Sequence, residues 1–173
     1  HLMAVLRLCV ERGWHATAWQ LVDAMWPLFL RLRHYDLWIE AHRIGLEAAR
    51  GHGHREAERQ MLNSGAIGLS AARRTDEAAE WYSASLSAAR EAGDARDEGQ
   101  ALLGLGACHY EAGRFAEAVA HLNRAVTTWE GCGYPRGVAL ARIVLGEVAL
   151  AEHDLERAVT CFARAREGLR AVA

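Results

Sequence analysis

The stretch ALLGLGACHYEAGRFAEAVAHLNRA, residues 101–125, decides the fold of this chain. Its first half places apolar residues such as Leu102 and Leu105 at the spacing of one face of an α-helix. Gly113 then interrupts the pattern, and a glycine at such a point typically closes a helix in the left-handed conformation. A second amphipathic run begins at Phe115. The stretch therefore predicts a hairpin of two helices.

The same unit recurs with a period of about 40 residues, which predicts stacked copies of one supersecondary unit. Two series of residues keep the spacing: Gly13, Gly53, Gly93 and Gly133, and Gln20, Gln60 and Gln100. No stretch shows the period-two alternation of a strand. We predict an all-α fold, an α-solenoid whose nine helices cover residues 1–12, 15–33, 36–51, 55–72, 75–92, 95–112, 115–131, 135–152 and 155–171. Thr75 and Asp154 are expected as N-caps, and Pro135 is expected in the first turn of a helix.

The third and fourth units resemble the tetratricopeptide repeat (TPR). The matching positions are Leu105-Gly106, Ala118, Leu122 and Ala125 in one unit, and Leu145-Gly146, Ala158, Phe162 and Ala165 in the next. The resemblance implies a right-handed superhelix in which small residues such as Gly106 and Ala118 let two helices approach closely. It also implies one array over residues 1–173: the second helix of a truncated repeat (1–12), a divergent repeat (15–53), and repeats at 55–94, 95–134 and 135–173.

The first full unit departs from this pattern. Trp26 and Trp38 fall where close-contact small residues belong, and Pro27 lies inside the expected helix. Either the hairpin opens to accept two indoles, or the register shifts locally. Four tryptophans lie in this region, and they form either an aromatic docking surface or a thick core: Trp14, Trp19, Trp26 and Trp38. Residues 17–50 are also similar to helical repeats of large bacterial transcriptional regulators, in which an NTPase module precedes a TPR region.

Composition narrows the class of partner. The formal net charge is −2, and all 20 basic residues are arginine with no clustered block, so direct nucleic-acid binding is disfavoured. The apolar runs are too short to span a membrane. Cys9, Cys108, Cys132 and Cys161 lie far apart, which is typical of reduced thiols in a cytoplasmic protein. The absence of lysine and the abundance of alanine suggest a GC-rich, bacterial coding sequence.

No recognisable catalytic motif is present. The sequence lacks a P-loop, a GxSxG elbow and an HExxH helix, so we expect no enzyme activity and no cofactor. His52 and His54 flank a glycine, but no third ligand is spaced to complete a tetrahedral metal site. His109 and His121 are expected to meet across one hairpin as ordinary, partly buried imidazoles.

We expect binding on the concave face, which the first helix of each hairpin lines in TPR proteins. In this register the candidate contacts are Gln20, Asp23, Gln60, Asn63, Gln100, Leu103, Tyr110, Leu140, Ile143 and Glu147, with Leu150 beside them. A row of glutamines can bond a peptide backbone, although glutamine is also simply a good, solvated helix former. The expected function is a protein- or peptide-binding module of a larger bacterial transcriptional regulator. The alternatives are a sensor of a small molecule or peptide signal and a free-standing scaffold; open solenoid ends would allow self-association.

Overall fold

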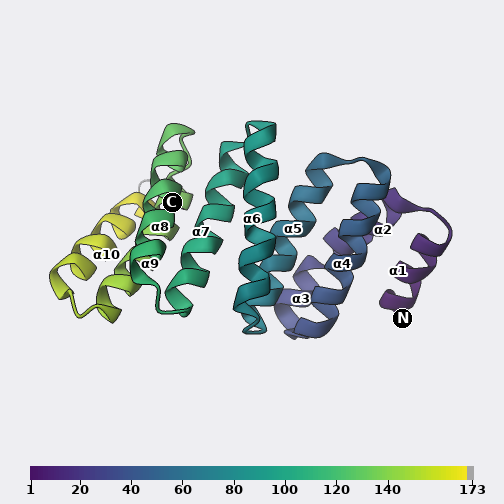
Figure 1. The fold of residues 1–173 in the computed structure, drawn as a ribbon, viewed down its shortest axis with the longest axis horizontal. Helices are drawn as coiled ribbons and strands as arrows, with labels where there is room; N and C mark the ends of the chain where they lie inside the picture. Colours follow the sequence, from purple (N-terminus) through teal and green to yellow (C-terminus); the bar gives the residue numbers. More distant parts are fainter. Residues whose placement is uncertain (171–173) are drawn as a thin grey trace. The chain divides into compact units, whose positions relative to one another are not determined.

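The computed structural model describes residues 1–170, and within that range every regular element is an α-helix (Figure 1). The ten helices are α1 (Leu2–Glu11), α2 (His15–Ala24), α3 (Trp26–Leu32), α4 (Tyr35–His52), α5 (Arg55–Ala71), α6 (Thr75–Ala92), α7 (Ala95–Glu111), α8 (Phe115–Gly131), α9 (Pro135–Ala151) and α10 (Leu155–Arg170). The all-α solenoid prediction is confirmed. The end of the last predicted helix, residue 171, lies outside the described residues.

The prediction of one helix over residues 15–33 is wrong, and ten helices replace nine in the described range. The helix is interrupted at Met25. The N–H of Met25 donates to the carbonyl oxygens of Leu21 and Val22, and α3 begins at the next residue. Pro27 explains the break, because a proline inside a helix removes one N–H and its ring clashes with the carbonyl four residues earlier. In the observed structure Pro27 lies in the first turn of α3, where a missing N–H is harmless.

Most of the residues predicted to begin, cap or close a helix have these roles in the structure. Gly113 and Gly133 have φ values of 72° and 66°, the left-handed conformation that closes a helix at little cost for glycine. Pro135 is the first residue of α9. Asp154 accepts a hydrogen bond from the backbone N–H of Arg157 at 3.0 Å, so it caps α10 as expected. Thr75, also expected as a cap, is instead the first residue of α6.

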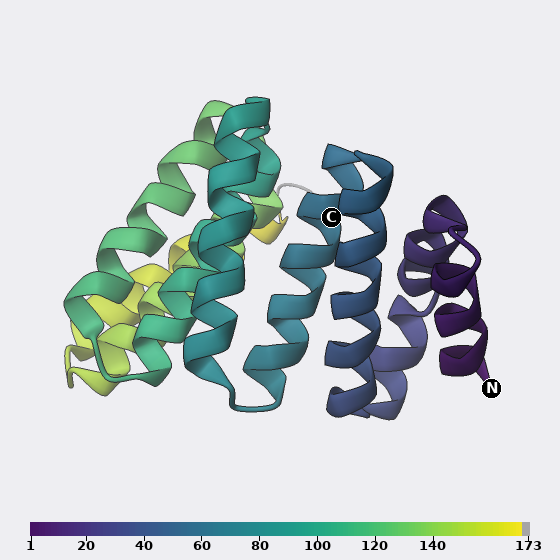
Figure 2. The same cartoon turned by 45° about the vertical axis from the view of Figure 1, so that its right-hand side comes forward.

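The chain divides into two compact units, His1–Ala88 and Ala89–Ala173. In the first unit α4 packs against both α2 and α5, and α1 lies against α2 and α4 (Figure 2). In the second unit α7 pairs with α8, α8 contacts α9, and α9 pairs with α10. The first helices also touch one another, α2 with α5 and α7 with α9. Among residues 1–170 no helix is long and apolar enough to cross a membrane.

Large side chains pack directly against helical glycines, which sets how closely helices approach. A Cβ atom at Gly106 would lie 2.6 Å from Cγ of Leu122, so the close approach of α7 and α8 predicted at this position is confirmed. The Trp129 ring is fully buried and contacts Gly99 of α7 and Gly137 of α9. In the first unit, the Trp38 ring packs in the same way against Gly68.

Candidate functional site

The predicted binding residues lie on two faces, one in each unit. In the first unit, Gln60 of α5 donates a hydrogen bond from Nε2 to Oδ1 of Asp23 on α2. Gln20 is exposed, and Asn63 is half-buried. The Oδ1 atom of Asn63 is buried and has no hydrogen-bond partner among the described residues. The structure therefore joins two predicted residues of adjacent first helices into one polar contact and leaves a buried amide oxygen beside it.

In the second unit, α9 carries an exposed stripe at helical spacing. Leu140 is 38% exposed and Leu150 is 46% exposed, and Glu147 lies exposed between them. Gln100 and Tyr110, on the adjacent helix α7, are both half-buried. The Tyr110 ring packs at a tilt against Phe115, with 6.2 Å between ring centroids. This face combines two accessible leucines, one carboxylate and one amide.

Leu103 and Ile143 lie nearer to helix contacts than to this stripe. Leu103 packs against the buried cluster of Ala118, Leu122 and Val148, and so lies among α7, α8 and α9. Ile143, 40 residues later, is half-buried and lines a cavity between α9 and α10. Their role in binding stays a prediction.

Most of the tryptophan cluster belongs to the core. Trp38 is 2% exposed, and its Nε1 donates to the carbonyl oxygen of Ser64 at 2.9 Å. The Trp26 ring meets Trp38 edge-on with 5.0 Å between centroids, and Phe29 stacks on Trp38 at 5.8 Å. The break before α3 lets the divergent hairpin accommodate both indoles. Trp14 alone of the four is largely exposed, at 54%.

His42 is a buried residue that the sequence analysis missed. Its ring lies among Trp26, Phe29 and Trp38, and its Nδ1 donates to the carbonyl oxygen of Trp38 at 2.9 Å. Burial lowers the pKa of His42 to about 4, although the backbone hydrogen bond acts in the opposite direction. Its position four residues after Trp38, on the same helical face, was the available signal.

The paired histidines do not resemble a metal centre. His109 and His121 stack with 5.0 Å between centroids, as expected, and Nδ1 of His109 accepts a hydrogen bond from Nε of Arg114 at 3.0 Å. Burial, and then the neighbouring His109 and Arg90, lower the pKa of His121. Nδ1 of His54 accepts from the backbone N–H of Ala57, which makes His54 a helix cap. No group of three potential ligands that could hold a metal ion occurs among residues 1–170.

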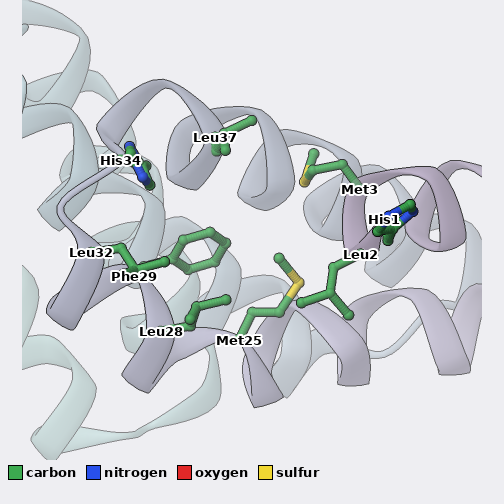
Figure 3. Close-up of a pocket in the computed structure, with 9 residues that line it drawn as sticks. All are labelled: His1, Leu2, Met3, Met25, Leu28, Phe29, Leu32, His34 and Leu37. Carbon is green, nitrogen blue, oxygen red and sulfur yellow. The ribbon is translucent and has the colours of Figure 1, made fainter.

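An apolar cavity that the sequence did not indicate lies between α1, α3 and α4 (Figure 3). Its volume is about 270 Å³. The lining side chains are almost all aliphatic, thioether or aromatic: Leu2, Met3, Met25, Leu28, Phe29, Leu32 and Leu37, with His1 and His34 beside them. Such a lining can hold an apolar group, but it offers no charged side chain to orient one.

Solved structures with similar folds are helical solenoids of low sequence identity. BtubC (BKLC) from P. vanneervenii is 18% identical with a TM-score of 0.79, over 98% of this chain and 72% of BtubC. Aspartyl phosphate phosphatase F from Bacillus subtilis is 12% identical with a TM-score of 0.81, over 90% of this chain and 41% of the phosphatase. A Rap protein complexed with Competence and Sporulation Factor is 16% identical with a TM-score of 0.79, over 88% of this chain and 43% of that protein.

These likenesses show the fold alone, and the chain spans less than half the length of the latter two proteins. No curated protein sequence matches the chain. A sequence model of the tetratricopeptide repeat matches residues 58–131 and again residues 97–171, well over half of the chain. Together with the stacked hairpins, the closing glycines and the close contact at Gly106, this match shows that the chain belongs to the tetratricopeptide repeat family.

Proposed function

We propose that this chain is a non-catalytic module that binds a polypeptide segment on its first helices, as the sensing part of a larger bacterial transcriptional regulator. Membership of the tetratricopeptide repeat family supports a recognition role, because stacked repeats offer extended surfaces. A Rap protein with a similar fold was solved in complex with Competence and Sporulation Factor, which supports the same kind of role. The regulatory context is tested by whether the complete coding sequence carries an NTPase or DNA-binding module.

The observation that carries the proposal is the exposed stripe on α9. Leu140 and Leu150 lie ten residues apart, about 2.8 helical turns, so they are about 80° apart round the helix, and both side chains are accessible. Burying accessible leucine side chains under a ligand contributes free energy in proportion to the apolar area removed from water. The amide of Gln100, on the neighbouring helix, can donate to and accept from a peptide backbone. The ligand of best fit is therefore a segment with two apolar anchors.

The charges of these faces favour a ligand with a basic residue. Glu147 lies between the two leucines, and Asp23 contributes a carboxylate to the face of the first unit. A lysine or arginine of the ligand beside Glu147 would form an exposed ion pair, which typically contributes less than about 1 kcal/mol. We therefore expect salt to weaken binding only modestly, while the apolar anchors supply most of the affinity.

The test begins with selection of binding peptides from a displayed random library, followed by titration of the best binder. We expect Leu140→Ser and Leu150→Ser each to weaken binding by roughly tenfold, as expected for anchor residues. The matched control is Leu155→Ser on α10, which removes a leucine that is 66% exposed and lies off the face. The double variant Gln100→Ala, Tyr110→Ala should also bind more weakly. Unchanged affinity in these variants, with loss in Trp14→Ala, would move the site to the exposed tryptophan.

The apolar cavity favours a second candidate function, the sensing of a small apolar molecule. A volume of about 270 Å³ lined by Met25, Leu28 and Phe29 would hold a short hydrocarbon or a single ring. A fluorescent apolar dye provides the test. We expect Leu28→Trp, which fills the cavity, to abolish dye binding, whereas Leu150→Ser should leave it unchanged. Equal dye binding by the wild type and Leu28→Trp would contradict this candidate.

A further inference from the structure

Two turns of the first compact unit hold an arginine in an unusual backbone conformation. Arg33, between α3 and α4, has a φ value of 54°, and Arg73, 40 residues later between α5 and α6, has a φ value of 62°. In the repeat of α7 and α8 the same position is Gly113. Glycine adopts this left-handed conformation freely, whereas a residue with a Cβ atom adopts it at a cost. The chain keeps arginines where glycine would fold more easily, which points to a role for their side chains.

A cavity of about 440 Å³ lies between these two turns. It is lined by the start of α4 and the end of α5, through the residues Arg33, His34, Tyr35, Asp36, Leu37 and Ala72. Both turns lie at the lower edge of the unit in Figures 1 and 2. Because α3 precedes the first turn and α6 follows the second, the cavity lies inside the series of helices and not at an end of it.

Positive charge exceeds negative charge around this cavity. Arg33 is exposed and forms no ion pair with any of residues 1–170. Glu77 is shared by two arginines: Nε of Arg74 lies 2.6 Å from its Oε1, and NH2 of Arg43 lies 3.0 Å from its Oε2. Arg74 also attracts Asp36, the one carboxylate of the lining. The acids near the cavity are thus compensated, while the charge of Arg33 is available to a ligand.

We propose that this turn edge, defined by the six residues that line the cavity, binds an acidic polypeptide segment with an apolar residue beside its carboxylates. The guanidinium of Arg33 would pair with a carboxylate of the segment, and the imidazole of His34 would donate a hydrogen bond to it. Leu37 is 44% exposed and would be covered by the apolar residue. The turn edge shares no residue with the leucine stripe on α9, so this inference does not depend on the proposed function.

The arrangement of charges favours an acidic polypeptide over a nucleic acid or a second copy of this chain. Asp36 in the lining and Glu77 beside it would repel an unbroken row of phosphates, whereas the carboxylates of a polypeptide can be spaced to avoid them. Glu58 and Glu98, acids in the first turns of their helices, already pair within the chain. An acidic segment other than those of residues 1–170 therefore fits the turn edge best.

The probe is a fluorescently labelled synthetic peptide, Glu-Glu-Leu-Glu-Glu-Leu-Glu-Glu, which is titrated with the full chain and followed by anisotropy. We expect saturable binding that weakens clearly as salt is added, because the attraction is between exposed charges. Arg33→Glu should weaken binding by roughly five- to tenfold, since an attraction becomes a repulsion. The control Arg12→Glu makes the same change at an exposed arginine that closes α1, and should leave the affinity nearly unchanged.

Two further variants separate binding from folding. Arg33→Gly removes the charge but introduces the residue that suits the left-handed turn, so the thermal midpoint should not fall while the probe binds more weakly. Arg33→Lys keeps the charge and should retain most of the affinity. Leu37→Ser should weaken the probe, but it should hardly affect a peptide with alanine in place of leucine, because the two leucines are expected to contact each other.

Several outcomes would overturn the proposal. The first is an absence of saturable binding to the wild type, or equal binding of a probe whose glutamates are all replaced by glutamine. Another is equal weakening by Arg33→Glu and Arg12→Glu. Tighter binding of an oligothymidylate that Arg33→Glu abolishes would make a nucleic acid the occupant, and self-association in sedimentation that Arg33→Glu abolishes would make it a second copy. Leu150→Ser should leave the probe unaffected, so failure of the turn edge and failure of the leucine stripe are distinguishable.

Discussion

His42 shows how one enclosed side chain makes stability depend on pH. Its folded pKa of about 4 lies below the ordinary histidine value of 6.5, because burial disfavours the imidazolium. The unfolded chain therefore binds the proton more tightly between these two values. The stability that a neutral His42 contributes is fully present above pH 6.5 and is lost as the pH falls towards 4.

We expect His42→Leu to remove this part of the pH dependence. Between pH 6.5 and pH 5 the wild type should lose about 2 kcal/mol more unfolding free energy than the variant, since each pKa unit corresponds to about 1.36 kcal/mol. Urea denaturation of both proteins at the two pH values gives the difference directly. Other histidines and carboxylates titrate in both proteins and cancel. Parallel pH profiles would show that His42 is protonated without penalty.

Replacement by alanine should change stability in opposite directions at two glycines, one near the start of α7 and one at the end of α8. Gly99→Ala would drive a Cβ atom into the buried Trp129 ring, so it should cost roughly 1–3 kcal/mol. A Cβ atom added at Gly131 would meet no atom within 4 Å, and Gly131 has no positive φ, so Gly131→Ala should stabilise by about 0.5–1 kcal/mol. Thermal midpoints that move in opposite directions would confirm the packing. A stabilising Gly99→Ala would mean that Trp129 does not occupy this contact.

At the scale of elements, α3 is held by two aromatic side chains, Phe29 and Trp26, which both pack on Trp38. Of its seven residues only Phe29 is buried, and its ring stacks on Trp38. Phe29→Ala should therefore cost roughly 3 kcal/mol and loosen α3, which keeps only the contact of Trp26 with Trp38. Hydrogen exchange of residues 26–32 should accelerate more than that of α4. Leu28→Ala, one residue earlier and 38% exposed, is the control and should cost less than about 1 kcal/mol. Equal effects of the two substitutions would contradict this account.

The hairpins of residues 55–170 were predictable at this same scale because their signals are local. Closing glycines such as Gly113, the cap at Asp154 and the contact between Gly106 and Leu122 depend on residues a few turns apart. The split into α2 and α3 was harder to predict. Pro27 signals an interruption, but the position of the break depends on how Trp26 and Phe29 fit against α4, which is a tertiary contact.

The candidate site was less predictable than the fold, for a physical reason that concerns the whole molecule. The repeat register places Leu140 and Ile143 near one face, because they occupy the positions that Gln100 and Leu103 have one period earlier. It does not tell which of them a neighbouring helix covers. The structure leaves Leu140 exposed and places Ile143 at the cavity beside Phe162. Exposure depends on the next element in the stack, so it follows from assembly and not from spacing.

The stacking of helices predicts the order in which the helices of the second unit lose stability when one hairpin is destabilised. Ala118 is fully buried at the contact of α7 and α8, so Ala118→Leu should overpack this hairpin and cost roughly 1–3 kcal/mol. In a solenoid each hairpin is stabilised chiefly by its neighbours, so α9, which contacts α8, should lose protection next and α10 after it. Hydrogen exchange across residues 95–170 measures this order.

The control for that experiment is Ala116→Leu, an exposed position on the first turn of α8, where the added side chain meets solvent. It should leave both the thermal midpoint and the exchange pattern nearly unchanged, because a surface substitution on a helix costs little. An unchanged midpoint in Ala118→Leu would show that the repeat register is wrong. Loss of protection confined to α8 would show instead that the register is right but that the hairpins of this unit unfold independently. A graded loss from α8 to α10 is the result that nearest-neighbour coupling requires, because α10 reaches α8 through its contact with α9.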